Sequence, residues 1–175
     1  MRENHRRVDD GDAESSARQP TREQAAAFEV RREDRDRTLE ALRALEEALG
    51  GAAPGRQIDW LKQVIAAFES LVRALSKELG ESNRADSLLS MISRDYPRRF
   101  GSRVRHLRGQ HVDIYQQATS LRAQLEDMEG AVDFTDLRQR VNSLMGAIYH
   151  RRARETDLVY EAIELDLGRP PTSAR

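Results

Sequence analysis

The sequence predicts an all-α protein: an antiparallel up-down-up-down four-helix bundle with a short extra helix between the second and third long helices. Few aromatic residues and abundant Ala, Leu, Arg and Glu favour helices. Residues 97–127 repeat an inward position every three or four residues, which places eight side chains on one side of a helix of about 29 residues, roughly 44 Å long. That helix needs partners along its length. The eight are Phe100, Val104, Leu107, His111, Ile114, Ala118, Leu121 and Leu125.

The first two long helices are predicted on the N-terminal side. Thr21 caps the first, which runs to Leu49 and ends at two glycines. The second runs over residues 57–79, and we expect Gly80 to end it and Trp60 to lie at the edge of its stripe. Its apolar stripe is the widest in the chain: Leu61, Val64, Ile65, Phe68, Leu71, Val72, Leu75 and Leu79.

The remaining boundaries follow from capping residues and prolines. We expect Ser82 or Asn83 to cap a short helix near residues 86–95, and Pro97 to begin the third long helix. Asp133 or Thr135 caps the last helix, which reaches about residue 167. The predicted organisation is a disordered charged tail at 1–21, the bundle at 22–168 and a disordered C-terminal tail at 169–175.

Composition excludes several classes of site. With no cysteine, the chain has no disulfide, thiolate metal ligand or cysteine nucleophile. A net charge of −1 argues against a globally basic nucleic-acid-binding protein, and no apolar run is long enough to span a membrane. We expect a cytoplasmic protein, and no serine or histidine motif predicts an enzyme.

Polar residues interrupt the predicted core stripes at similar heights. His111 is centred on the stripe of the third long helix and Glu155 on that of the fourth, with Arg151 beside it and Arg35 on the first. Arg35, His111 and Arg151 each lie about 20 Å along their helices from one end of the bundle. A single buried polar layer is therefore predicted.

Two segments resemble the hemerythrin-like (HHE cation-binding) domain family, a four-helix bundle whose members usually hold a non-haem di-iron centre. Residues 107–111, Leu-Arg-Gly-Gln-His, are similar to that family's Leu-x-x-Glu-His, with Gln110 in place of the glutamate. Residues 151–162, with Asp166 and Gly168, are similar to its His-x-x-x-Glu-x-Asp-Leu run, with Arg151 at the histidine position. The resemblance covers residues 25–168 and is sharp only in the third and fourth long helices.

The resemblance implies a ligand set that this chain largely lacks. Only His111 and Glu155 stand at ligand positions, because His106 and His150 are turned away from the core. We therefore expect a degenerate member without a di-iron cofactor. In one interpretation, the guanidinium groups of Arg151 and Arg35 replace the metal ions and pair with Glu155. In the other, Arg151 reaches solvent along its stem and His111 is an ordinary core histidine.

The predicted function is non-catalytic: a binding or regulatory module acting through its surface or its charged N-terminal tail. We expect another protein as the partner rather than nucleic acid or a membrane, and no oligomeric state is predicted. One alternative keeps a residual non-haem iron site at His111 and Glu155, completed by Glu78 or Glu81, for oxygen sensing or metal storage. Another is a small-ligand pocket lined by arginines and suited to an anion.

A second candidate binding site is a cluster of basic residues early in the third long helix. Such a patch can bind an anion or an acidic partner, although few aromatic residues accompany it. The simpler interpretation is a solvated face paired with nearby acids. The patch consists of Arg98, Arg99, Arg103, Arg105 and Arg108.

Overall fold

The computed structural model describes residues 21–51, 57–127 and 134–167. They form five helices and no strand: α1 (Arg22–Gly50), α2 (Gln57–Ser82), α3 (Leu88–Asp95), α4 (Pro97–Glu126) and α5 (Phe134–Leu167). The protein is therefore all-helical, as predicted. Apart from Thr21, the two predicted tails lie outside the described residues, as do Asp133 and Gly168.

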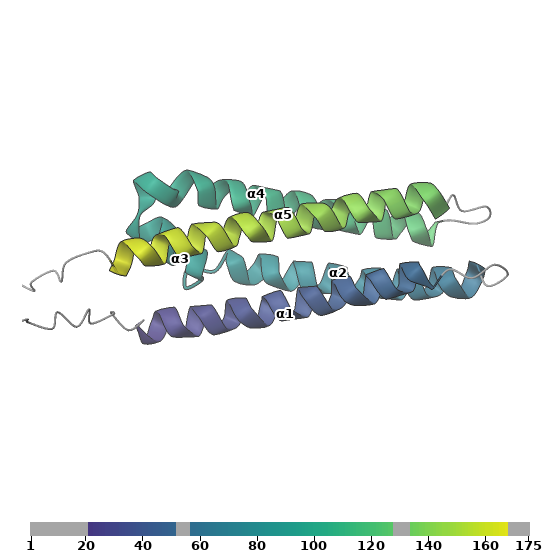
Figure 1. The fold of residues 1–175 in the computed structure, drawn as a ribbon, viewed down its shortest axis with the longest axis horizontal. Helices are drawn as coiled ribbons and strands as arrows, with labels where there is room; N and C mark the ends of the chain where they lie inside the picture. The colour runs from purple at the N-terminus through teal and green to yellow at the C-terminus, as the bar shows by residue number, and fades with distance from the viewer. Residues whose placement is uncertain (1–20, 52–56, 128–133, 168–175) are drawn as a thin grey trace, which may run out of the picture.

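The four long helices run along one common axis, with α3 at one end (Figure 1). α2 packs against both α1 and α4, α4 packs against α5, and α3 packs mainly against α4. None of the described helices has the length and apolar character needed to cross a bilayer.

Helix starts follow the local capping chemistry. Thr21 and Gln24 form a capping box at the start of α1, with the side chain of each accepting from the backbone N–H of the other. Pro97 begins α4, where a missing N–H costs no helical hydrogen bond.

Two predicted boundaries were wrong. Gly80 does not end α2; it stays within the helix, and its carbonyl accepts from the N–H of Asn83 at 3.3 Å. The cap of α3 is Ser87, whose Oγ accepts from the N–H of Ser90 at 3.3 Å, rather than Ser82 or Asn83. The Ser87 hydroxyl also donates to the carbonyl of Ser82 at 2.9 Å, so it joins the end of α2 to the start of α3.

The core consists of two apolar clusters. The large core cluster occupies the half of the molecule distant from α3 and contains Ala41, Leu42, Leu45, Leu49, Trp60, Val64, Ala67, Phe68, Leu71, Ala74, Leu75, Ile114, Ala118, Leu121, Leu125, Leu137, Val141, Leu144, Met145 and Ile148. The small core cluster lies beside α3 and contains Ala27, Leu88, Leu89, Met91, Ile92, Phe100, Val104, Leu107, Leu158, Val159 and Ala162. All eight inward residues of the predicted α4 stripe are buried.

Trp60 was predicted at the edge of the α2 stripe but is only 3% exposed within the large core cluster. Its position one turn before Val64 continues the inward face of α2, and burial of its large ring removes much apolar surface from water.

α1 and α5 are held together by long side chains rather than by close approach of their backbones. Arg31 of α1 donates to Glu155 of α5, and Arg152 of α5 donates to the backbone carbonyl of Arg35. Nearer the other end, Arg138 donates to the carbonyl of Leu49. Several polar groups of the core therefore lie along this boundary between α1 and α5.

Candidate functional site

A buried layer of polar side chains separates the two core clusters. Each of the four long helices contributes to it, and along α1, α4 and α5 it interrupts an otherwise apolar inward face. We call this set the ionic layer; it consists of Arg31, Asp34, Thr38, Glu78, His111, Arg151, Arg152 and Glu155.

Arg151 connects the layer across the molecule. Its residue is 3% exposed, and its guanidinium donates through Nη1 to Oε2 of Glu155 at 3.0 Å. Nη2 of the same group donates to Oε1 of Glu78 on α2. One guanidinium therefore bridges two carboxylates on different helices, an arrangement suited to its planar set of donors.

Glu78 receives donors from three sides. Arg152 donates to its Oε2 at 3.1 Å, and the Thr38 hydroxyl lies 2.8 Å from the same oxygen. Burial by itself would raise the pKa of Glu78, but the charges of Arg151 and Arg152 outweigh it and hold that pKa below its ordinary value. Glu78 is therefore an ionised carboxylate at neutral pH.

Glu155 pairs with arginines from two helices. Besides its partner Arg151, it accepts from Nε of Arg31 at 3.0 Å, and Arg31 also reaches the hydroxyl of Thr156 at 3.4 Å. The side chain of Glu155 is 11% exposed, so little water competes for these bonds.

Asp34 forms a separate pair at the margin of the layer. Its Oδ1 accepts from Nη1 of Arg37 at 2.6 Å. Burial raises the pKa of Asp34, and the neighbouring charges of Glu78 and Glu81 act in the same direction, while Arg37 opposes them.

His111 is fully buried within the layer. Neither ring nitrogen has a hydrogen-bond partner of ordinary geometry among the described residues. Burial, assisted by the charge of Arg151, lowers its pKa to about 4, against the opposing effects of Glu78, Glu155 and the backbone of Leu75. The imidazole is therefore neutral at pH 7.

The charge of the layer depends on Arg37, which lies outside it. Within the layer, the arginines Arg31, Arg151 and Arg152 balance the carboxylates Asp34, Glu78 and Glu155 when all are ionised, and His111 is uncharged. Arg37 pairs with Asp34 and adds one positive charge. The layer and Arg37 together thus carry one excess positive charge.

The structure brings together three of the four predicted core residues, His111, Arg151 and Glu155. Arg35 is the exception and corrects the prediction: its side chain is 52% exposed, and only its backbone carbonyl joins the layer. The inward positions of α1 fall at Arg31, Asp34 and Thr38, which turns Arg35 outward.

Asp34 and Thr38 were not predicted from the sequence, and Glu78 was named only as an alternative ligand of a residual iron site. A signal was present, because positions 27, 34, 38, 41 and 45 continue the three-and-four spacing of the α1 core. From the sequence alone, however, polar residues at those positions cannot be distinguished from residues that face solvent, because their burial depends on the partner helices.

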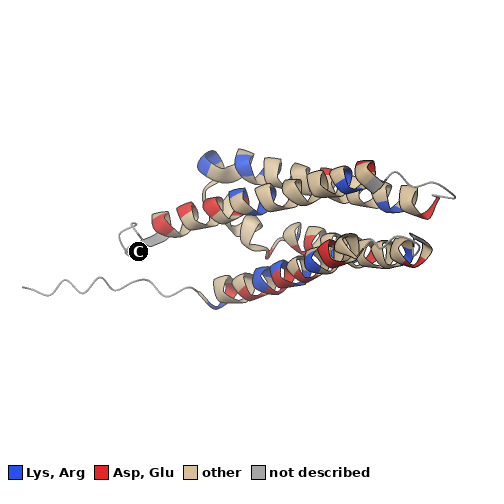
Figure 2. Ribbon diagram, turned by 45° about the vertical axis from the view of Figure 1, so that its right-hand side comes forward, with Lys and Arg blue, Asp and Glu red and all other residues tan. Residues whose placement is uncertain are grey.

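The predicted basic patch does not form one free surface. Arg99 and Arg103 both pair with Glu161 of α5. Arg108 donates to the carbonyl of Ser82 at 2.8 Å and to the hydroxyl of Ser90, so it joins α4 to the segments before it. Arg98, Arg99, Arg103 and Arg105 are all exposed. Figure 2 shows acidic and basic residues interleaved along α1, whereas the first half of α4 contains no acidic residue.

The carboxylates of the ionic layer are arranged around arginines rather than around an open position for a metal ion. The described residues contain no group of three or more histidines and carboxylates arranged to hold a metal ion. Glu78 and Glu155, two of the alternative iron ligands, both bind the guanidinium of Arg151, and Glu81 lies 3.5 Å from Arg84. A guanidinium therefore lies between the carboxylates that a metal ion would need.

Comparisons of the chain with protein-family models, curated proteins and solved structures found no match.

Proposed function

We propose that the protein is a non-catalytic binding or regulatory module of the cytoplasm, built as a hemerythrin-like antiparallel four-helix bundle that has lost its di-iron site. Its partner is another protein, and it uses neither a resident metal nor an organic cofactor. The proposal rests on the fold and the ionic layer together, with the resemblance of residues 107–111 and 151–162 as its source.

One observation carries this proposal: the guanidinium of Arg151 bridges Glu78 and Glu155 in the interior. A cation fixed in this way supplies the positive charge that buried carboxylates require, which is also what a metal ion would supply. Both oxygens of Glu78 and both oxygens of Glu155 already accept from arginines. Iron would therefore first have to displace a guanidinium and leave its charge buried and unpaired.

Metal content tests this part of the proposal. The full chain would be expressed with ample iron, purified without chelator and analysed by inductively coupled plasma mass spectrometry, with helical content checked by circular dichroism. We expect a folded protein with less than one tenth of an equivalent of iron, about the level of adventitious binding. About two irons per folded chain would contradict the proposal and support the oxygen-sensing or metal-storage alternative.

A further inference from the structure

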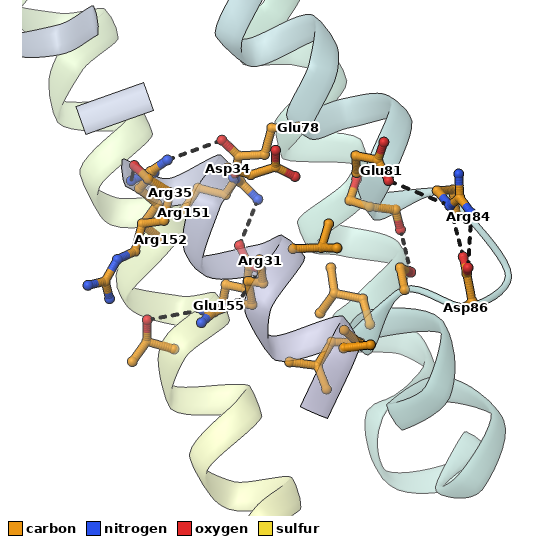
Figure 3. A pocket seen from close by; sticks show the side chains of 18 of the residues that line it. Arg31, Asp34, Arg35, Glu78, Glu81, Arg84, Asp86, Arg151, Arg152 and Glu155 are labelled. Carbon is orange, nitrogen blue, oxygen red and sulfur yellow. Dashed lines mark hydrogen bonds and ion pairs between the residues drawn. The ribbon is translucent and has the colours of Figure 1, made fainter. Parts of the chain in front are cut away.

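A cavity of about 340 Å³ opens beside the ionic layer, between α1, α5, the end of α2 and the start of α3 (Figure 3). Its volume is in the range of sites that bind small molecules. It lies where α1 and α5 are joined by side chains rather than by close backbone packing, so the layer forms one of its walls.

The layer wall presents positive charge. Arg31, Arg151 and Arg152 all line the cavity. Together with Arg37, the partner of Asp34, they exceed the carboxylates of the layer by one charge. Arg151 and Arg152 are 3% and 9% exposed, and the Nε–H of each is a buried donor without a hydrogen-bond partner among the described residues. Buried donors of this kind are costly unless an acceptor reaches them.

The buried carboxylates of the cavity do not call for a cationic ligand, because each already has an arginine partner. Glu78 and Glu155 are paired within the layer, and Asp34 is paired with Arg37. The mouth contains three further acids, Glu23, Glu81 and Asp86, beside Arg35 and Arg84. Arg84 binds Asp86 through two nitrogens and lies 3.5 Å from Glu81. Water screens these outer charges more than those of the buried wall.

Apolar residues form another part of the cavity lining, which we call the apolar wall. They are Ala26, Ala27 and Val30 of α1 and Leu88 and Leu89 of α3. Val30 is 43% exposed, so a bound apolar group would remove part of its surface from water.

We propose that this cavity binds a small amphipathic monocarboxylate, with its carboxylate toward Arg31, Arg151 and Arg152 and its apolar tail against Val30, Leu88 and Leu89. A single negative charge matches the single excess positive charge of the layer and Arg37 together. This inference goes beyond the proposed function, because it adds a small-molecule ligand to the binding module. It rests on the proposed function in one respect: a guanidinium rather than a metal ion occupies the layer.

Isothermal titration calorimetry of the full chain, with its metal content measured in the same preparation, tests the inference with three probes. 4-Phenylbutanoate carries both features of the proposed ligand, acetate has the carboxylate alone, and 4-phenylbutylamine has the same tail with the opposite charge. We expect saturable binding of 4-phenylbutanoate at one site with a Kd on the order of 1 mM or tighter. Acetate should bind at least about tenfold more weakly and the amine not at all.

Variants locate the site. Arg31→Gln removes the excess charge and should weaken binding of 4-phenylbutanoate about fivefold or more, whereas Arg43→Gln, an exposed change on the same helix, should leave it unchanged. Val30→Asp, at a partly exposed position on the apolar wall, should abolish binding without a change in the core.

The outcomes are separable. A folded, metal-free chain that does not bind 4-phenylbutanoate, or binds the amine equally well, overturns the inference and leaves the proposed function standing. Binding that survives both Arg31→Gln and Val30→Asp also overturns it, because the ligand would then lie elsewhere. Stoichiometric iron would overturn the proposed function instead.

Discussion

The two halves of this molecule are stabilised in different ways. In the half distant from α3, the large core cluster fills the space between helices with fully buried side chains such as Phe68, Leu71 and Leu125. In the half beside α3, a smaller apolar cluster is separated from it by the ionic layer, and α1 and α5 approach each other mainly through arginines. The same helices thus pack apolar side chains closely in one half and balance buried charges in the other.

This difference determines how each half should respond to substitution. Apolar contacts have no direction, so loss of one side chain costs the contacts and space of that side chain alone. Charged groups in the layer share partners: Arg151 pairs with Glu78 and Glu155, and Glu78 pairs with Arg151 and Arg152. Removing one charged side chain therefore leaves its partners buried without a balancing charge.

The largest effect is expected for Arg151→Met, which keeps an unbranched side chain but removes the charge. Glu78 and Glu155 would keep their burial and lose a shared partner, so we expect the free energy of unfolding in urea to fall by about 3–5 kcal/mol. Arg154→Met, at an exposed position on the same helix, should change it by less than about 0.5 kcal/mol. Equal small effects of the two substitutions would show that the layer contributes no more than a solvated face.

In the other half, Leu71→Ala should lower the free energy of unfolding by about 2–5 kcal/mol, because it leaves a cavity at a fully buried position. The loss should be the same at pH 7 and pH 5, since the large core cluster contains no titratable group. A pH-dependent loss would mean that the two halves are not energetically distinct.

Acidification should destabilise the protein through His111. Its pKa is about 4 in the folded protein and 6.5 when unperturbed, so between these values the unfolded chain binds more protons. The contribution of neutral His111 to the free energy of unfolding is fully present above pH 6.5 and is lost as the pH falls toward 4. This loss amounts to about 2 kcal/mol between pH 7 and pH 5.

Urea unfolding of the parent and of His111→Leu at the two pH values measures this loss, which should largely disappear in the variant. Glu78, whose pKa is lowered, contributes a loss only at more acidic pH. Because Asp34, whose pKa is raised, acts with the opposite sign in both proteins, the comparison between them is decisive. The same change in stability in the parent and in His111→Leu would refute a neutral buried His111.

The smallest effect is expected on the surface. Glu161 pairs with Arg99 and Arg103 in a water-exposed cluster, and hydrogen bonds from these two arginines, followed by their charges, hold its pKa below the ordinary value. Because exposed ion pairs are screened by water and salt, Glu161→Gln should leave the urea midpoint unchanged within error. A midpoint shift as large as that of Arg151→Met would remove the distinction between buried and surface pairs.

Much of the fold was predictable because the spacing of apolar residues along a helix indicates which side chains are buried. The spacing from Phe100 to Leu125 identified eight of the nine buried residues of α4, all but Gly101, and it placed His111 among them. Glycine and serine were less informative: Gly80 stays helical, and Ser87 rather than an earlier residue caps α3, because capping depends on which carbonyl and N–H groups the connection leaves unpaired.

The ionic layer was predictable only in part. A histidine or glutamate on an apolar stripe is conspicuous, which is why His111 and Glu155 could be found. On α1 the stripe itself is polar, so a shift of one residue exchanged Arg35 for Asp34, about 100° around the helix. Which arginine pairs with which glutamate depends on the heights of four helices, and a linear pattern does not contain that information.

A double-mutant cycle between Arg151 and Glu155 tests the central claim most directly, that these charges are balanced as a unit in the interior. The free energy of unfolding would be measured at pH 7 for the parent, Arg151→Met, Glu155→Gln and the double variant. We expect a coupling energy of at least about 2 kcal/mol, because the second change removes the charge that the first left unpaired. Additivity within about 0.5 kcal/mol would contradict the account.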